Sequence, residues 1–237
     1  MKINGHVKRV LLVTTLLSTL FYISACSDPE VKQRAEFKNY VENTVLRVGY
    51  ELPELSEDQK EKFGEYSQDY EAIFNFTKRF NEITERSFNP LMEHLSQIKV
   101  TEDYIALQPI LSEDLTKIFF LKSDIESLKS DTLSKLSKKS FPEDLNAVMT
   151  PAIEKLITLR ADPLLENIDG LVTLTKNVNQ LGLFLNENKA NITYVQGIPN
   201  FKSKELAESY NAMINKIAED IKYHEATIAL YNAFNEK

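Results

Sequence analysis

Hydrophobic side chains recur at alternating steps of three and four residues along most of the chain, which is the spacing of an amphipathic helix. Two seams keep this spacing over several turns. The first consists of Phe63, Tyr66, Tyr70, Ile73, Thr77, Phe80 and Thr84. The second consists of Tyr210, Ile214, Ile217, Ile221, His224, Ile228 and Tyr231. We expect both helices to be staves of an antiparallel bundle, with a homotypic coiled coil through the second seam as the alternative.

Capping residues and prolines divide the chain into helical segments. Asp28-Pro29 predicts a helix that runs to about Tyr50, and Ser56 with Gln59 forms a capping box for the next one. Three later positions are predicted boundaries, because proline disrupts a helix interior. Asn89-Pro90 is expected to break or kink a helix, Pro109 to interrupt one, and Asp162-Pro163 to begin one. The sequence therefore predicts an all-α fold, an irregular antiparallel bundle of about five to seven helices.

One segment departs from the helical pattern. Residues 192–195 are Ile-Thr-Tyr-Val, Gln196-Gly197 follows, and Ile198-Pro199 comes next. A β-branched and aromatic run followed by a glycine-containing pair is typical of a hairpin. Pro199 excludes a central strand, because proline donates no hydrogen bond to a ladder. We expect a small β-hairpin near residues 192–199, or an extended loop.

The N-terminus has the layout of an export signal. Lys2, Lys8 and Arg9 precede Val10 to Ile23, a 14-residue stretch without charge. A membrane-spanning helix needs about 20 apolar residues, so this stretch suits a signal that is removed. It ends in Ile23-Ser24-Ala25-Cys26, which resembles the bacterial lipobox.

The lipobox resemblance assigns a role to each of its residues. Ile23, Ser24 and Ala25 would be recognised by the signal peptidase, and the Cys26 thiol would accept the lipid. The alternative is an ordinary export signal with a chance cysteine. We expect residues 1–25 to be removed and residues 26–237 to form a single helical domain anchored at its N-terminus.

The cysteine count agrees with lipidation. Cys26 is the one cysteine in the sequence, so an exported chain would have no internal disulfide, and acylation explains the leftover thiol. Resemblance to bacterial lipoproteins implies three acyl chains on Cys26, which anchor stably where one does not. By the same resemblance, Ser27 favours the outer membrane, facing the periplasm, over the inner membrane. The expected partner is thus the membrane, through the lipid on Cys26.

Charge excludes one class of partner. The formal net charge is −7 and no basic patch stands out, so nucleic acid is not an expected partner. Anionic lipid surfaces would repel the body of the domain as a whole.

No catalytic or cofactor motif is visible. Nucleophile-elbow, phosphate-loop and zinc-protease patterns are missing from the sequence, so we expect neither an enzyme nor a cofactor. Asp220 and His224 lie one helical turn apart, but two ligands do not make a metal site, and His224 suits the core. His94, beside Glu93, is expected at the surface.

The aromatic seam has two interpretations. Tyr66, Tyr70 and Phe74 could line a groove for an apolar ligand, or they could belong to the core. The core interpretation is the more common one for a stripe at helical spacing.

The N-terminal third carries the most specific pattern. It consists of Phe37-x-x-Tyr40-Val41-Glu42-Asn43-Thr44-Val45-Leu46-Arg47, then Leu52-Pro53-x-Leu55-Ser56-x-Asp58-Gln59-Lys60-x-x-Phe63-Gly64, then Asp69-Tyr70 and Val100-x-x-Asp103-Tyr104. This pattern resembles the YiaF-like lipoprotein family of Gram-negative bacteria, a family with a domain of unknown function. The resemblance implies a lipid-anchored helical domain in the periplasm. The family supplies no known active site, so no catalytic residue is carried over.

Two functions remain open at this point. The first is a non-enzymatic binding or scaffold module of the cell envelope, with an envelope protein as its partner and an undetermined oligomeric state. The second is a carrier or chaperone for an apolar ligand held between the aromatic helices.

Overall fold

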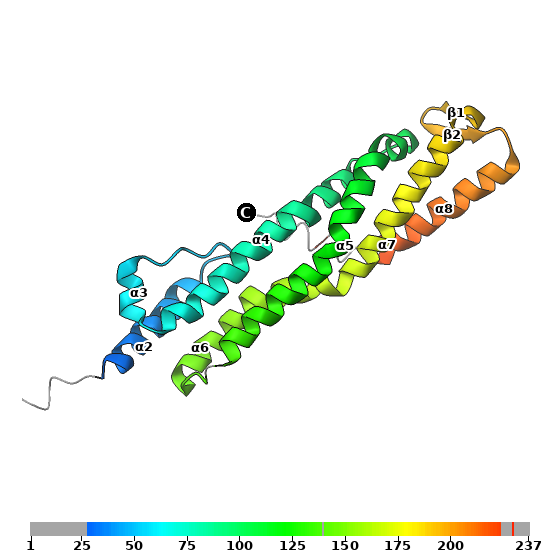
Figure 1. Ribbon diagram of the computed structural model, residues 1–237. Helices are drawn as coiled ribbons and strands as arrows, with labels where there is room; N and C mark the ends of the chain where they lie inside the picture. The colour runs from blue at the N-terminus through cyan, green and yellow to red at the C-terminus, as the bar shows by residue number, and fades with distance from the viewer. Residues whose placement is uncertain (1–27, 139, 224–228, 230–237) are drawn as a thin grey trace, which may run out of the picture.

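Three long helical staves form the body of the molecule in the computed structural model, which describes residues 28–138, 140–223 and 229. They are α4 (Tyr66–Ser96), α5 (Thr101–Ser137) and a continuous stave made of α6 (Glu143–Ile153), the π-helical turn η2 (Glu154–Thr158) and α7 (Leu159–Glu187). Successive staves run antiparallel and give an elongated bundle (Figure 1). At about 1.5 Å per residue, the 37 residues of α5 alone extend over roughly 55 Å.

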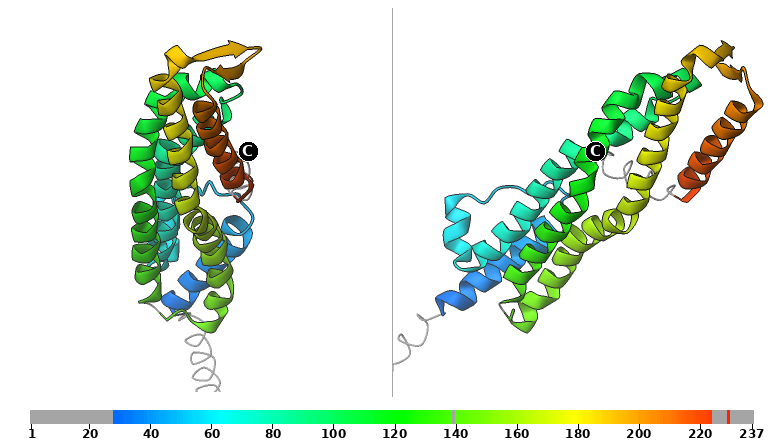
Figure 2. Two further views of the ribbon diagram at one scale, coloured as in Figure 1. Left: turned by 90° about the vertical axis from the view of Figure 1, so that its right-hand side faces the viewer. Right: turned by 45° about the vertical axis from the view of Figure 1, so that its right-hand side comes forward.

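A fourth stave is made of two shorter helical segments, and each of them covers one half of the bundle's length. The helix α2 (Pro29–Tyr40), the π-helical turn η1 (Val41–Val45) and α3 (Glu57–Phe63) pack at one end. The helix α8 (Lys204–Tyr223) packs beside α7 at the other end (Figure 2). The body is therefore an all-α bundle, as the sequence predicts.

Local capping explains where the first helices begin. Asp28 Oδ1 accepts a hydrogen bond from the Glu30 backbone N–H at 3.1 Å, and Pro29 occupies the first turn. Ser56 and Gln59 form the expected capping box, with reciprocal bonds of 3.3 Å and 2.9 Å. Both predicted helix starts are confirmed.

The prolines do not end the helices. The predicted interruption at Pro109 and the predicted helix start at Asp162-Pro163 were wrong, and of the break or kink predicted at Asn89-Pro90 the break is excluded. Pro90 lies inside α4, Pro109 inside α5 and Pro163 inside α7. Proline costs a helix interior about 3 kcal/mol. Buried neighbours offset this cost, because Leu91, Leu111 and Leu164 beside these prolines are fully buried. Ending the helix would expose those side chains.

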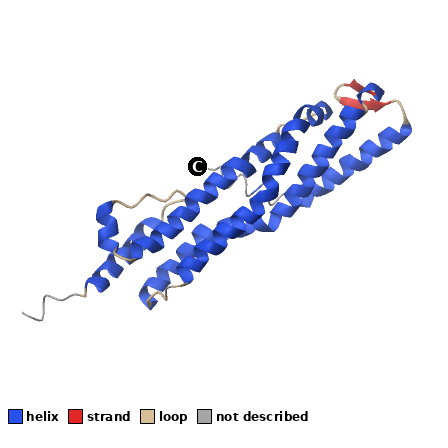
Figure 3. Ribbon diagram, viewed as in Figure 1, coloured by secondary structure: helices blue, strands red, loops and turns tan. Residues whose placement is uncertain are grey.

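The predicted hairpin is present. Strand β1 (Ile192–Val195) pairs antiparallel with β2 (Ile198–Phe201), so that Val195 lies opposite Ile198 (Figure 3). The turn residues Gln196 and Gly197 have φ of 53° and 76°, and a two-residue hairpin turn with two positive φ values matches the right-handed strand twist. Pro199 fits because the sheet has two strands and leaves an edge free.

The two ends of the bundle are built differently. The N-terminal pole holds Asp28, the end of α5 and the start of α6 (Figure 1). The hairpin pole holds the hairpin, the 97–100 turn between α4 and α5, and the start of α8. A hydrogen-bond contact of 3.3 Å between the Thr101 and Tyr210 hydroxyls joins α5 to α8 there.

Buried apolar side chains form one cluster through the bundle. Aromatic residues dominate its N-terminal half, and leucines and isoleucines of α5 and α7 continue it. Among the described residues, no helix is long and apolar enough to cross a membrane.

Candidate functional site

The predicted lipobox lies outside the described residues. This applies to Cys26, to Ile23, Ser24 and Ala25, and to the predicted cleavage after residue 25. Asp28 is the first described residue, and it stands two positions after Cys26 at the N-terminal pole (Figure 1). The chain therefore enters the bundle at its end and not along its side.

An aromatic cluster lies near this pole, where the predicted groove residues meet α2. Tyr70 is 1% exposed, and its hydroxyl donates a hydrogen bond to the Pro53 carbonyl. Its ring lies 5.5 Å from the Tyr40 ring and 6.3 Å from the Phe74 ring. Burial, followed by the contact with Tyr40, raises the pKa of Tyr70 far above its ordinary value. Tyr70 is thus a core residue whose phenol is kept neutral.

The other two groove candidates are half-buried. Tyr66 stacks on Phe37 at 5.7 Å and contributes to an open hollow of about 640 Å³ beside Pro29, Phe141 and other residues of the N-terminal pole. Phe74 packs against the core cluster. The structure brings Tyr66, Tyr70 and Phe74 onto one helix face, and a ligand groove along them stays a prediction.

A half-buried histidine paired with a buried carboxylate joins α4 to α5. His94 Nδ1 donates to Asp114 Oδ2 at 2.6 Å, and Asp114 is 0% exposed. Lys117 Nζ lies 3.8 Å from the other carboxylate oxygen. The expectation of a surface His94 was wrong, because the Asp114 carboxylate draws the imidazole between the helices. The signal for Asp114 was its position, since it continues the apolar seam of Leu111 and Ile118 at steps of three and four.

The second candidate pair is only half described. Asp220 Oδ2 accepts a hydrogen bond of 2.5 Å from Asn177 Nδ2, which ties α8 to α7. His224 lies outside the described residues. Within residues 28–138, 140–223 and 229, no three His, Cys, Asp or Glu side chains come together as metal ligands.

A buried arginine lies at the middle of the bundle. The Arg160 guanidinium stacks 4.5 Å from the Tyr50 ring centroid and 4.7 Å from that of Phe80, and its Nη2 donates to Asn81 Oδ1 at 2.7 Å. Burial lowers the pKa of Arg160 to about 10. This cation–π sandwich locks the start of α7 against α4. Sequence reasoning missed it, although Arg160 interrupts an apolar seam that includes Ile157 and Leu164.

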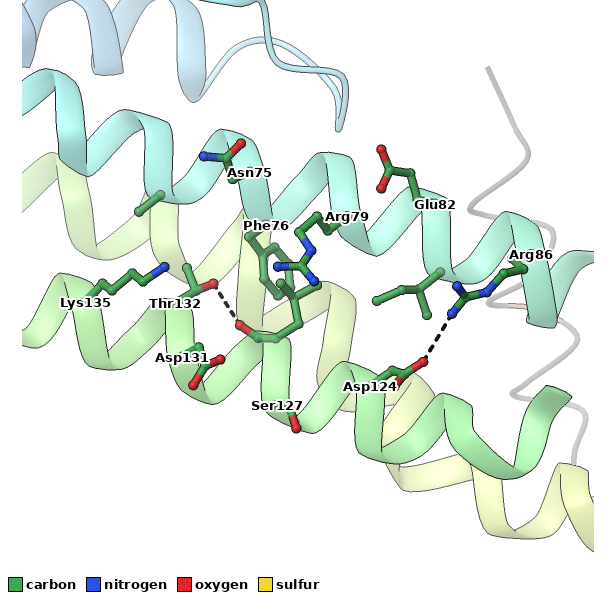
Figure 4. A pocket seen from close by; sticks show the side chains of 13 residues that line it. Asn75, Phe76, Arg79, Glu82, Arg86, Asp124, Ser127, Asp131, Thr132 and Lys135 are labelled. Carbon is green, nitrogen blue, oxygen red and sulfur yellow. Dashed lines mark hydrogen bonds and ion pairs between the residues drawn. The ribbon is translucent and has the colours of Figure 1, made fainter.

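A polar hollow of about 440 Å³ lies between α4 and α5 (Figure 4). Arg79 and Arg86 reach from α4 towards α5, and Arg86 Nη2 contacts Asp124 Oδ2 at 3.2 Å. Acidic and basic side chains alternate around it, including Glu82, Asp131 and Lys135. Mixed charges of this kind satisfy one another across an exposed helix pair, and they single out no ligand.

Sequence comparisons assign the chain to a family without assigning it a function. A family described as "Protein of unknown function (DUF3053)" matches residues 13–232. The protein called "Uncharacterized protein YiaF" from Escherichia coli K12 is 27% identical over 192 residues, which covers 81% of each chain. The protein of the same description from Shigella flexneri matches equally well. No solved structure gives a significant match. Because the family match spans nearly the whole chain, this protein belongs to the DUF3053 family, a YiaF-like family whose function is unknown.

Proposed function

We propose that this protein is a lipid-anchored, non-enzymatic module of the Gram-negative envelope that presents a binding or scaffold surface away from its membrane. The observation that carries the proposal is the placement of the lipobox. Cys26 stands two positions before Asp28, and Asp28 lies at one end of an elongated bundle. Acyl chains on Cys26 would therefore hold the N-terminal pole at the lipid surface.

The interior of the bundle supports a scaffold role. The buried charges Asp114 and Arg160 each contact side chains of a neighbouring stave, and these contacts hold the helices together. Perturbed groups of an enzyme would instead converge on a cleft with room for substrate. A stiff body with helix-to-helix ties suits a protein that holds a surface at a fixed distance from its anchor.

The test is the intact mass of the protein extracted from membranes, for the wild type and for Cys26→Ala. We expect the wild type to have lost residues 1–25 and gained the mass of acyl chains, and Cys26→Ala to keep its N-terminus unacylated. Ser27→Asp is the matched variant for sorting, because it should keep the lipid mass and move the protein to the inner-membrane fraction. A wild type that retains residues 1–25 without lipid refutes the proposal.

The open hollow beside Tyr66 supports the second candidate function, a carrier of an apolar ligand. Its test is binding of a fluorescent fatty acid to the protein. Phe141→Gln, in the hollow, should weaken binding at least tenfold. Phe119→Gln, at an exposed aromatic far along α5, should leave it unchanged. Equal binding by both variants, or none by the wild type, excludes this function at the hollow.

A further inference from the structure

The hollow beside Tyr66 opens at the pole where the chain enters the bundle. It has a volume of about 640 Å³ and lies between the start of α2, the start of α4 and the turn before α6. Two prolines and two half-buried aromatic rings form its apolar wall, namely Pro29, Pro142, Tyr66 and Phe141. Asp28 also lines the hollow, and two residues of chain from Asp28 to Cys26 span at most about 7 Å. A lipid on Cys26 would therefore lie beside the opening.

The charged side chains that line the hollow are all acidic. Asp28, Glu30 and Glu65 contribute carboxylates, and no lysine or arginine of the described residues lines it. Within the part of the chain that the structure describes, none of these three carboxylates forms an ion pair. Glu30 Oε1 accepts a hydrogen bond of 3.4 Å from the Tyr66 hydroxyl. Burial, followed by the negative charge of Glu30, raises the pKa of Tyr66, so the phenol stays neutral and adds no further charge.

The basic side chains around the hollow do not reverse its sign. Residues 28–36, 57–69 and 137–144 build this pole, and they contain ten Asp and Glu against six Lys and Arg, a net charge of −4. Arg34 already pairs with Asp144 at 3.4 Å. With every charged side chain of the pole counted, the hollow attracts a cation and repels an anion.

Aromatic rings beside carboxylates favour an ammonium group as the cation. A carboxylate accepts charge-assisted hydrogen bonds from ammonium N–H groups, and the face of an aromatic ring attracts the same positive charge. The Tyr66 ring is held in position, because it stacks on Phe37 at 5.7 Å and its hydroxyl donates to Glu30. An anionic headgroup would instead meet three like charges.

We infer that this hollow binds the primary ammonium group of a phospholipid headgroup, of the phosphatidylethanolamine type, in the membrane that holds the N-terminal pole. The inference rests on the proposed function, because acyl chains on Cys26 would bring the hollow among the headgroups. A primary ammonium has three N–H donors for the carboxylates, whereas a trimethylammonium has none. Anchoring also raises the local concentration of headgroups, so a site of low intrinsic affinity is filled. A lysine of another protein carries the same group but has no such proximity.

A bound headgroup would orient the bundle on its membrane. Acyl chains on Cys26 hold the protein through a single point, about which the bundle can tilt. A headgroup in the hollow adds a second contact at the same pole. The hairpin pole, at the opposite end of the bundle, would then point away from the membrane (Figure 1).

The test is native mass spectrometry of the full-length protein, extracted from membranes in detergent. The protein is mixed with equal amounts of phosphatidylethanolamine, phosphatidylcholine and phosphatidylglycerol that carry the same acyl chains. We expect about tenfold more bound phosphatidylethanolamine than phosphatidylglycerol, and about fivefold more than phosphatidylcholine, which lacks N–H donors. The protein mass in the same spectrum reports acylation of Cys26, so failure of the proposed function is seen separately from loss of lipid selectivity.

Paired variants locate the binding site. Glu30→Gln with Glu65→Gln keeps the size of two exposed side chains and removes their charge, and it should lower bound phosphatidylethanolamine by about tenfold. Glu113→Gln with Glu126→Gln is the matched control, because these exposed glutamates of α5 do not line the hollow, and it should change nothing. Circular dichroism melts of both pairs should match the wild type.

Three outcomes would overturn the inference. They are equal binding of phosphatidylethanolamine and phosphatidylcholine, equal loss in the control pair, and no bound lipid on the wild type. Equal binding of all three lipids would show that the hollow recognises acyl chains, which is the second candidate function.

Discussion

Replacing Gly182 with alanine sets helix propensity against packing. Gly182 lies in the interior of α7, where α7 crosses α5. An added Cβ would stand 2.3 Å from the Tyr104 carbonyl oxygen and 2.9 Å from Gln108 Cβ. A polar network fixes the same crossing, since Gln108 Nε2 and Ser112 Oγ both donate to Asn179 Oδ1, at 3.1 Å and 3.0 Å. The helices therefore cannot separate without breaking these bonds.

The two effects have opposite signs. Alanine in place of glycine favours an isolated helix by about 1 kcal/mol. Overpacking of a well-packed core costs about 1–3 kcal/mol, and the upper end applies because the blocking atom belongs to the backbone and cannot rotate away. We therefore expect Gly182→Ala to lower the free energy of unfolding by about 2 kcal/mol. For a chain of 237 residues this is a fall in Tm of about 4–8 °C.

The assay is thermal unfolding by circular dichroism, with urea unfolding to give the free energy. Gly49→Ala is the matched control, because an added Cβ at Gly49 meets nothing within 4 Å. It should leave the Tm unchanged or raise it slightly through the lower entropy of the unfolded chain. If Gly182→Ala is as stable as Gly49→Ala, the close approach of α7 to α5 is wrong.

Three further predictions concern buried polar groups. Asp114→Ala should lower the free energy of unfolding in urea by about 2 kcal/mol, because it leaves the half-buried His94 imidazole without its hydrogen-bond partner. Asp124→Ala should lower it by less than about 1 kcal/mol, because the ion pair of Asp124 with Arg86 is exposed. Equal losses in the two variants would contradict this prediction. The raised pKa of Tyr70 gives stability that is complete below pH about 10 and declines at higher pH, so Tyr70→Phe should flatten this decline in unfolding measured from pH 8 to 12. Arg160→Lys should lower the Tm by several degrees, because lysine lacks the planar group that stacks between two rings; an unchanged Tm would refute the stacking.

Local signals in the sequence determined the elements of this fold. The three- and four-residue spacing gave the staves, Asp28 and Ser56 gave two helix starts, and the Gln196-Gly197 pair gave the hairpin. These features depend on contacts between residues a few positions apart, which is why a single sequence reveals them. The lipobox resemblance at Cys26 is of the same kind, because a short contiguous segment carries it.

Tertiary packing decided what the local signals left open. Pro109 was predicted to interrupt a helix, Asp162-Pro163 to begin one and Asn89-Pro90 to break or kink one, yet buried leucines beside these prolines keep the staves continuous. The sequence placed His94 at the surface, and only the approach of α4 to α5 brought it to Asp114. The position of a residue on a helix is a local property, but the helix that it faces is not. The hairpin pole shows the same limit, since Val100 and Gly197 meet there only because the fold joins two distant turns.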